Sequence, residues 1–88
     1  MDERALEKSL KAMANRRRLA ILRYLKKSKE ASVGEIAGAI KLSFRSTSRH
    51  LAVLSGSDIL EREQRNLQIF YSISPVQPLA VRNILSIL

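Results

Sequence analysis

The hydrophobic residues in the N-terminal half of the chain recur with the period of amphipathic helices. In the first segment, apolar residues at spacings of three and four lie among charged ones, which predicts a helix from about Asp2 to Ala14. The next apolar set lies in RRRLAILRYLKK, where Asn15 can cap a second helix. The residues of this second helix that we expect in the core are Leu19, Ile21, Leu22 and Leu25.

Two further helical segments follow, separated by a tight connection. Ser32 and Glu35 have the spacing of a capping box, in which each side chain satisfies a backbone amide of the other residue, so a third helix begins there. After the connection KLS, Ser43 can cap a fourth helix that runs from Phe44 to about Gly56. Two helices joined by so short a turn form a helix-turn-helix.

Beyond the fourth helix the hydrophobic period changes to that of a strand. Every second residue from 67 to 73 is apolar, which predicts a strand with one buried face. The segment ILEREQ can pair with it as a hairpin that turns near Arg65 and Asn66, since asparagine tolerates a left-handed backbone. The residues predicted for the buried face are Leu67, Ile69, Tyr71 and Ile73.

A last helix is predicted to begin at Ser74 and Pro75, because proline is favoured at the first helical position. The segment VQPLAVRNILSIL within it is apolar on more than one face. We therefore expect residues 1–88 to form one domain, mainly α with a small β-hairpin.

The charge and composition of the chain narrow its function. Sixteen Lys and Arg against eight Asp and Glu give a net charge of +8, which suits a polyanionic partner. The absence of cysteine excludes disulfides and thiol-based metal or redox sites. Neither a signal peptide nor a stretch long enough to span a membrane is present, so we expect a cytoplasmic protein without a membrane partner.

The sequence offers no constellation for catalysis. The single histidine, His50, has no cysteine or second histidine to work with, and the carboxylates are scattered over charged helix surfaces. We expect neither an enzyme nor a bound cofactor.

Several segments carry a resemblance to a known family. MANRRRLAILRYL, SVGEIAGAIKLS, SRHLAVL and IFYSIS, in this order, resemble the winged helix-turn-helix repressors of the ArsR/SmtB family over nearly the whole chain. The resemblance implies a dimeric winged helix-turn-helix fold that binds double-stranded DNA.

The fourth helix has the two faces that a DNA recognition helix needs. Helical spacing puts Thr47 on the side of the core leucines, with its hydroxyl bonded back to the helix, and puts Arg45 and Arg49 on the opposite side. No carboxylate occurs between Glu35 and Asp58, so the helix would not repel phosphates. The candidate DNA-contacting residues of this helix are Phe44, Arg45, Ser46, Ser48, Arg49 and His50.

Other roles for some of these residues stay open. Phe44 can cover the turn instead of meeting thymine methyls, and His50 can pack near the turn or contact a phosphate. The run Arg16 to Arg18 lies in the first turn of a helix, where the macrodipole disfavours cations. Three explanations are open: these arginines lie near a DNA phosphate, they pair with Asp2, Glu3 or Glu7, or one guanidinium is buried.

The resemblance makes the hairpin a wing that lies along the DNA. Glu61 and Glu63 would have to face away from the phosphates. The glycine frequent at the wing tip of the family is missing, and Asp58 stands where a glycine often ends the recognition helix. The candidate wing contacts are Arg62, Gln64, Arg65 and Asn66.

The apolar last helix favours a homodimer, because it offers more apolar surface than one side of a small domain can cover. In the family the first and last helices form the dimer interface. The candidate interface residues are Leu6, Leu10, Met13, Leu79, Val81, Ile84, Leu85 and Leu88. The alternative is a monomer whose last helix packs on its own first helix.

Together these features predict a sequence-specific transcriptional regulator, a homodimeric repressor of a pseudo-palindromic operator. Family members that sense metals use cysteines or clustered His, Asp and Glu on the last helix, and this chain has neither, so we expect no metal site. The alternative function is a protein- or RNA-interaction module on a winged-helix scaffold.

Overall fold

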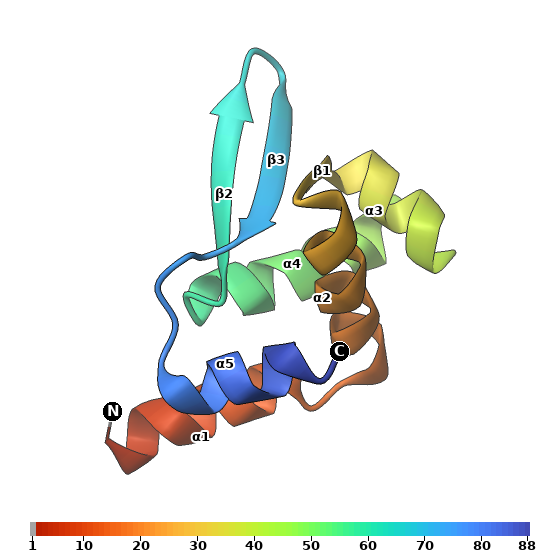
Figure 1. The fold of residues 1–88 in the computed structure, drawn as a ribbon. Coiled ribbons are helices and arrows are strands. Elements are labelled where there is room, and N and C mark those ends of the chain that lie inside the picture. The colour runs from red at the N-terminus through yellow and green to blue at the C-terminus, as the bar shows by residue number, and fades with distance from the viewer. Residues whose placement is uncertain (1) are drawn as a thin grey trace.

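The computed structural model describes residues 2–88, which form five helices and three strands (Figure 1). The predicted helix-turn-helix and hairpin are both confirmed. The elements are α1 (Glu3–Met13), α2 (Arg16–Ser28), β1 (Glu30–Ser32), α3 (Val33–Ile40), α4 (Phe44–Gly56), β2 (Leu60–Arg65), β3 (Gln68–Ile73) and α5 (Leu79–Ser86).

The side chains predicted to cap helices do so. Asn15 Oδ1 accepts from the amides of Arg17 and Arg18, at 2.9 and 3.1 Å. Ser32 and Glu35 form the complete capping box at the start of α3. Ser43 caps α4, which has the predicted bounds. Each of these signals acts within one helical turn, so the local sequence is sufficient to set these helix starts.

The sheet contains a strand that the sequence analysis missed. Its order is β1-β3-β2, and β1 pairs antiparallel with β3 from Glu30↔Ser72 to Ser32↔Phe70. The sequence pattern predicts no element for residues 30–31 and makes Ser32 a helix cap. The buried Ala31 anchors β1 in the core, and Ser32 both ends this strand and caps α3. The sheet and the helix-turn-helix therefore meet without a linker.

The hairpin turn lies one residue later than predicted. The register Arg65↔Gln68 leaves a two-residue turn, in which Asn66 has a positive φ of 55°. Leu67 is the second turn residue and is 98% exposed, so its predicted place on the buried face was wrong. The alternation of apolar residues continues into the turn at Leu67, although β3 begins only at Gln68.

The last helix begins at Leu79 and not at Pro75, which corrects the predicted start. The residues before Pro75 and Pro78 are both disfavoured in helical conformation. The side-chain amide of Gln77 also donates from Nε2 to the carbonyls of Ile59 (2.9 Å) and Ser74 (3.0 Å). These bonds hold the segment before α5 against the base of the hairpin.

One core joins the helices and the sheet and anchors the fourth helix. Leu51 and Leu54 of α4 are fully buried, as predicted. Thr47 is also fully buried, but among the described residues its Oγ1 has no hydrogen-bond partner, so the predicted bond back to the helix is wrong. The other fully buried large side chains are Ile21, Leu22, Leu25, Ile36, Ile59 and Val81.

Four residues with side chains have positive φ in the described chain. They are Lys29, Lys41, Asp58 and Asn66. Asp58 follows α4 with φ 60°, the conformation for which glycine is usually chosen.

Candidate nucleic-acid interface

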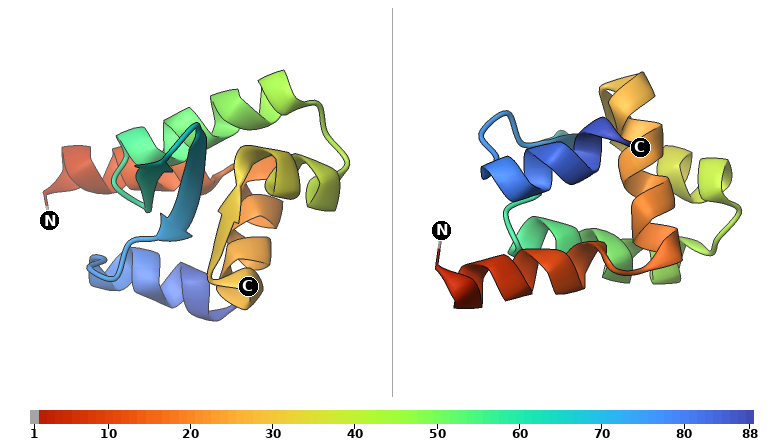
Figure 2. Two further views of the ribbon diagram at one scale, coloured as in Figure 1. Left: turned by 90° about the horizontal axis from the view of Figure 1, so that it is seen from above. Right: turned by 60° about the horizontal axis from the view of Figure 1, so that its bottom comes forward.

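The α4 helix separates a buried face from a cationic outer face. In Figure 2 (left), α3 and α4 lie on one side of the molecule and α5 lies on the opposite side. Arg45 and Arg49 project from α4 into solvent, whereas Leu51 and Leu54 hold the helix to the core. The remaining α4 candidates divide into the exposed Phe44 and the half-buried Ser46, Ser48 and His50.

Phe44, the first residue of α4, has 63% of its surface exposed. It lines a groove of about 350 Å³ that also includes Val33 and Gly34 of α3 and Leu67 and Ile69 of the hairpin. The groove joins the start of α4 to the tip of the wing. Sequence reasoning did not assign Leu67 to this surface, because it placed that residue in the core.

The side chain of His50 contacts α2. Its Nδ1 lies 3.3 Å from a guanidinium nitrogen of Arg18. Burial lowers the pKa of the His50 imidazole below its ordinary value, and the positive charges of Arg18 and Arg17 lower it further. The neutral ring can accept a hydrogen bond from Arg18, which gives His50 the packing role that the sequence left open.

The arginines at the start of α2 do not pair with the acidic residues of α1. Arg18 Nε donates to the carbonyl of Ala12 at 2.6 Å, in the last turn of α1. Arg17 donates to the carbonyl of Ile40 at 3.2 Å, where α3 ends. Arg16 is exposed. Two of the three cations thus complement the negative ends of other helices.

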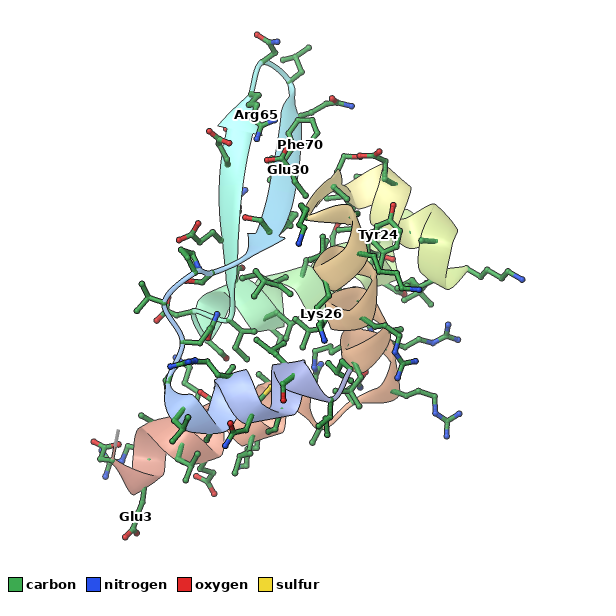
Figure 3. The ribbon with its side chains drawn as sticks, viewed as in Figure 1. Glu3, Tyr24, Lys26, Glu30, Arg65 and Phe70 are labelled. Carbon is green, nitrogen blue, oxygen red and sulfur yellow. The ribbon has the colours of Figure 1, made fainter. Side chains whose placement is uncertain are left out.

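Lys26, farther along α2, has the same kind of partner. Its Nζ donates to the carbonyl of Leu88 at 3.2 Å, just beyond the end of α5 (Figure 3). The α2 helix therefore supplies a cation to the C-terminal ends of three other helices. These side chains make structural contacts, whereas Arg45 and Arg49 of α4 have no side-chain hydrogen bond to any of residues 2–88.

The wing carries its residues on two faces. Arg62 and Gln64 share the face of the buried Tyr71, while Glu61 and Glu63 lie on the other face together with Arg65. Arg62 and Tyr71 also line a groove against the C-terminal half of α4. All four predicted wing contacts, Arg62, Gln64, Arg65 and Asn66, are exposed.

Arg65 is bound to carboxylates of its own chain. It donates to Glu63 of the same strand and to Glu30 of β1 (Figure 3). The hydrogen bond from Arg65 and its positive charge lower the pKa of the Glu30 carboxyl below the ordinary value. The bonds to Glu30 and Glu63 in turn raise the pKa of the Arg65 guanidinium. The predicted phosphate contact by Arg65 would have to compete with these bonds.

The residues predicted for a dimer interface fall into three groups. Met13, Val81 and Leu85 lie in the protomer's own core, so they were wrongly assigned to a surface. Leu10 and Leu79 are exposed, by 42% and 67%. Leu6, Ile84 and Leu88 are half-buried. The exposed members lie on α1 and α5, which contact each other within the protomer.

Two further apolar residues, one before α5 and one after it, are also exposed. Val76 is 83% exposed and Ile87 is 80% exposed.

Residues 2–88 contain no cluster of three or more His, Cys, Asp or Glu side chains that could hold a metal ion. Over the same range, none of the helices has the length and apolar character needed to cross a membrane.

Comparison with known proteins agrees with this geometry. The family described as Helix-turn-helix domain matches residues 13–63. The transcriptional activator HlyU of Vibrio cholerae is 38% identical over 76 residues, which is 86% of this chain and 69% of HlyU. The transcriptional repressor PagR of Bacillus anthracis is 38% identical over 65 residues, which is 74% of this chain and 65% of PagR.

Solved structures of relatives have the same fold. Reduced HlyU from Vibrio cholerae superposes with a TM-score of 0.79 at 34% identity, covering 94% of this chain and 83% of that one. A homodimeric winged helix-turn-helix DNA-binding domain from Mycobacterium bovis, a possible ArsR-family regulator, superposes with a TM-score of 0.80 at 26% identity, covering 94% and 73%.

A helix-turn-helix with a cationic outer face and an adjacent hairpin defines the winged helix-turn-helix class of DNA-binding transcriptional regulators. This chain belongs to the Helix-turn-helix domain family, as a regulator of the ArsR/SmtB type. The family resemblance inferred from the sequence is thereby confirmed.

Proposed function

We propose that this regulator binds a pseudo-palindromic operator as a homodimer and represses transcription by occluding the promoter. The observation that carries the proposal is the exposure of Arg45 and Arg49 on α4, opposite the face that anchors this helix. Two such helices in successive major grooves would read two half-sites. The proposed contacts are Phe44, Arg45, Ser46, Ser48 and Arg49 of α4, and Arg62, Gln64 and Asn66 of the wing.

The proposed dimer uses the exposed apolar residues at the α1 and α5 side. Leu10, Val76, Leu79 and Ile87 would be covered by the partner's copy of this surface. The homodimeric relative from Mycobacterium bovis supports this assembly. The side of the molecule that bears α4 remains free for DNA (Figure 2).

We further propose that this domain has neither a catalytic activity nor a metal effector. Residues 1–88 act as one DNA-binding domain in the cytoplasm, without enzymatic activity and without a metal effector. Regulation would then come from an organic ligand, a partner protein or the concentration of the protein itself.

Selection from random double-stranded DNA at physiological salt tests this function. Enrichment of a palindromic sequence, followed by repression of a reporter whose promoter overlaps that sequence, supports the repressor. Activation of the reporter would contradict the repressor role, as it would assign the role named for HlyU instead of that named for PagR. Failure to enrich any sequence, together with binding to RNA or to an acidic protein, would favour the interaction module.

A further inference from the structure

Arg65 occupies an unusually complete set of contacts near the tip of the wing. Nε and one terminal nitrogen donate to Oε1 of Glu63 at 2.9 and 2.7 Å, and the other terminal nitrogen donates to Oε1 of Glu30 at 2.9 Å. A fourth bond reaches Oε2 of Glu30. The guanidinium carbon lies 4.5 Å from the centroid of the Phe70 ring. Four of the five N–H donors of an arginine are therefore in use.

These contacts cross the sheet from one edge to the other. Arg65 lies in β2, Phe70 in the central β3, and Glu30 in β1 (Figure 3). Because β1 pairs only with residues 70–72 of β3, the outer part of the hairpin is a two-stranded ribbon that projects beyond the helices (Figure 1). Ribbons of two strands are marginally stable in isolation. Arg65 ties this ribbon to the strand that leads directly into α3.

The charge of the cluster argues against a phosphate contact. One guanidinium faces two carboxylates, Glu30 and Glu63, so the cluster as a whole is negative. A DNA phosphate would have to displace these carboxylates, which already hold the guanidinium from two sides. Ion pairs in a network that includes bidentate geometry are the surface pairs that contribute most to structure.

We propose that Arg65 is a positioning residue of the wing, which holds the projecting ribbon against β1 and does not contact a DNA phosphate. Through Glu30 and Ser32 it fixes the wing relative to α3 and α4. The part of this inference that concerns DNA rests on the proposed function. The part that concerns the wing does not, so the two can be tested separately.

Hydrogen exchange of the free protein tests the positioning of the wing. Glu30→Gln removes the carboxylate charge that Arg65 contacts across the sheet. Glu61→Gln is the matched control, because it removes a carboxylate from the face of β2 that carries Arg65. We expect amides of residues 63–70 to exchange about twofold to fivefold faster in E30Q than in E61Q. Equal exchange in the two variants would overturn the proposal, whether or not the protein binds DNA.

Affinity for the selected operator tests the role of Arg65 toward DNA. If Arg65 contacts a phosphate, E30Q frees it and tightens binding more than E61Q does. If Arg65 positions the wing, E30Q binds about twofold to fivefold more weakly than E61Q. Wild-type protein that binds no DNA would contradict the proposed function, and the exchange measurement would still decide the positioning of the wing.

The salt dependence of Arg65→Gln gives an independent readout. Loss of a phosphate contact lowers the magnitude of the slope of log affinity against log salt concentration by about one for each protomer, and therefore by about two for the dimer, whereas loss of positioning weakens binding with the slope unchanged. We expect the unchanged slope. Weaker binding with the magnitude of the slope lowered by about two for the dimer would overturn the proposal.

Discussion

Arg18 donates from Nε to the carbonyl of Ala12 at 2.6 Å, so a cation in the first turn of α2 satisfies the last turn of α1. The position is unfavourable for α2, by about 0.3–1 kcal/mol, because the N-terminal end of its dipole is positive. At α1 the same charge lies beside the negative end. The contact with His50 extends this arrangement to α4.

This relationship predicts different effects for two neighbouring arginines. Arg18→Ala should lower the free energy of unfolding by about 1–3 kcal/mol, because it leaves carbonyls of α1 without their charged donor. Arg16→Ala removes an exposed side chain of the same type and should change it by less than about 0.5 kcal/mol. Urea denaturation measures both values, and equal losses would contradict the capping role.

The environment of His50 predicts a dependence of stability on pH. Because its pKa is lowered in the fold, the unfolded chain binds a proton first as the pH falls. The contribution is complete above the ordinary pKa of about 6.5 and is lost as the pH falls from there toward the lowered folded value. His50→Asn keeps an acceptor for Arg18 but does not titrate. Unfolding measured between pH 8 and 5.5 should therefore vary less in H50N, and an equal variation would refute the assignment.

The outer face of α4 predicts the residues that distinguish operator sequences. Arg45→Ala and Arg49→Ala should each weaken operator binding by about 1–3 kcal/mol where the lost guanidinium contacts guanine, with a smaller loss on scrambled DNA. Arg82→Ala, on the exposed surface of α5, is the control. Fluorescence anisotropy on both DNAs provides the measurement. Unchanged specificity in both α4 variants would show that the reading face lies elsewhere.

The exposed and buried residues of α5 predict two separable effects. Leu79→Lys places a charge on an exposed position and should convert the dimer to a monomer with little change in folding. Val81→Ala removes buried methyl groups and should lower stability by about 2 kcal/mol while the dimer persists. Light scattering and urea denaturation distinguish these results. A dimeric L79K would move the interface to another surface.

The composition predicts indifference to zinc and to thiol oxidants. The chain has no cysteine, and four-coordinate zinc needs several ligands brought together. Operator affinity should therefore be unchanged by one equivalent of zinc or by an oxidant that acts on thiols. Tight binding of one zinc ion per protomer with release of DNA would disprove this, and the fold assignment would stand.

The sequence predicted those features whose causes are local. The starts of α2, α3 and α4 follow from Asn15, Ser32 and Ser43, each of which bonds to amides within its own first turn. The two faces of α4 follow from helical spacing alone. Asn66 takes its predicted left-handed conformation at the hairpin turn.

The features that could not be predicted depend on residues distant in the chain. The three residues of β1 show no period, and their partner strand lies beyond α3, α4 and β2. The contacts of Arg18 with His50 and of Arg65 with Glu30 join residues that are 32 and 35 positions apart, and spacing cannot identify such pairs. The exposed Leu67 continues the period of β3 into the turn, so the pattern itself misleads there.

The pairing of β1 with β3 has a consequence for how the protein folds. Glu30 and Ser72 are direct partners, and the whole helix-turn-helix lies in the loop that this pairing closes. β1 is synthesised before α3, α4 and its partner strand, so the sheet closes only after the helix-turn-helix has been made. A nascent chain that stalls before β3 would expose the unpaired edge of β1, and such an edge can pair with strands of other chains. Completion of the wing thus covers an edge of β1 that would otherwise stay open to other chains.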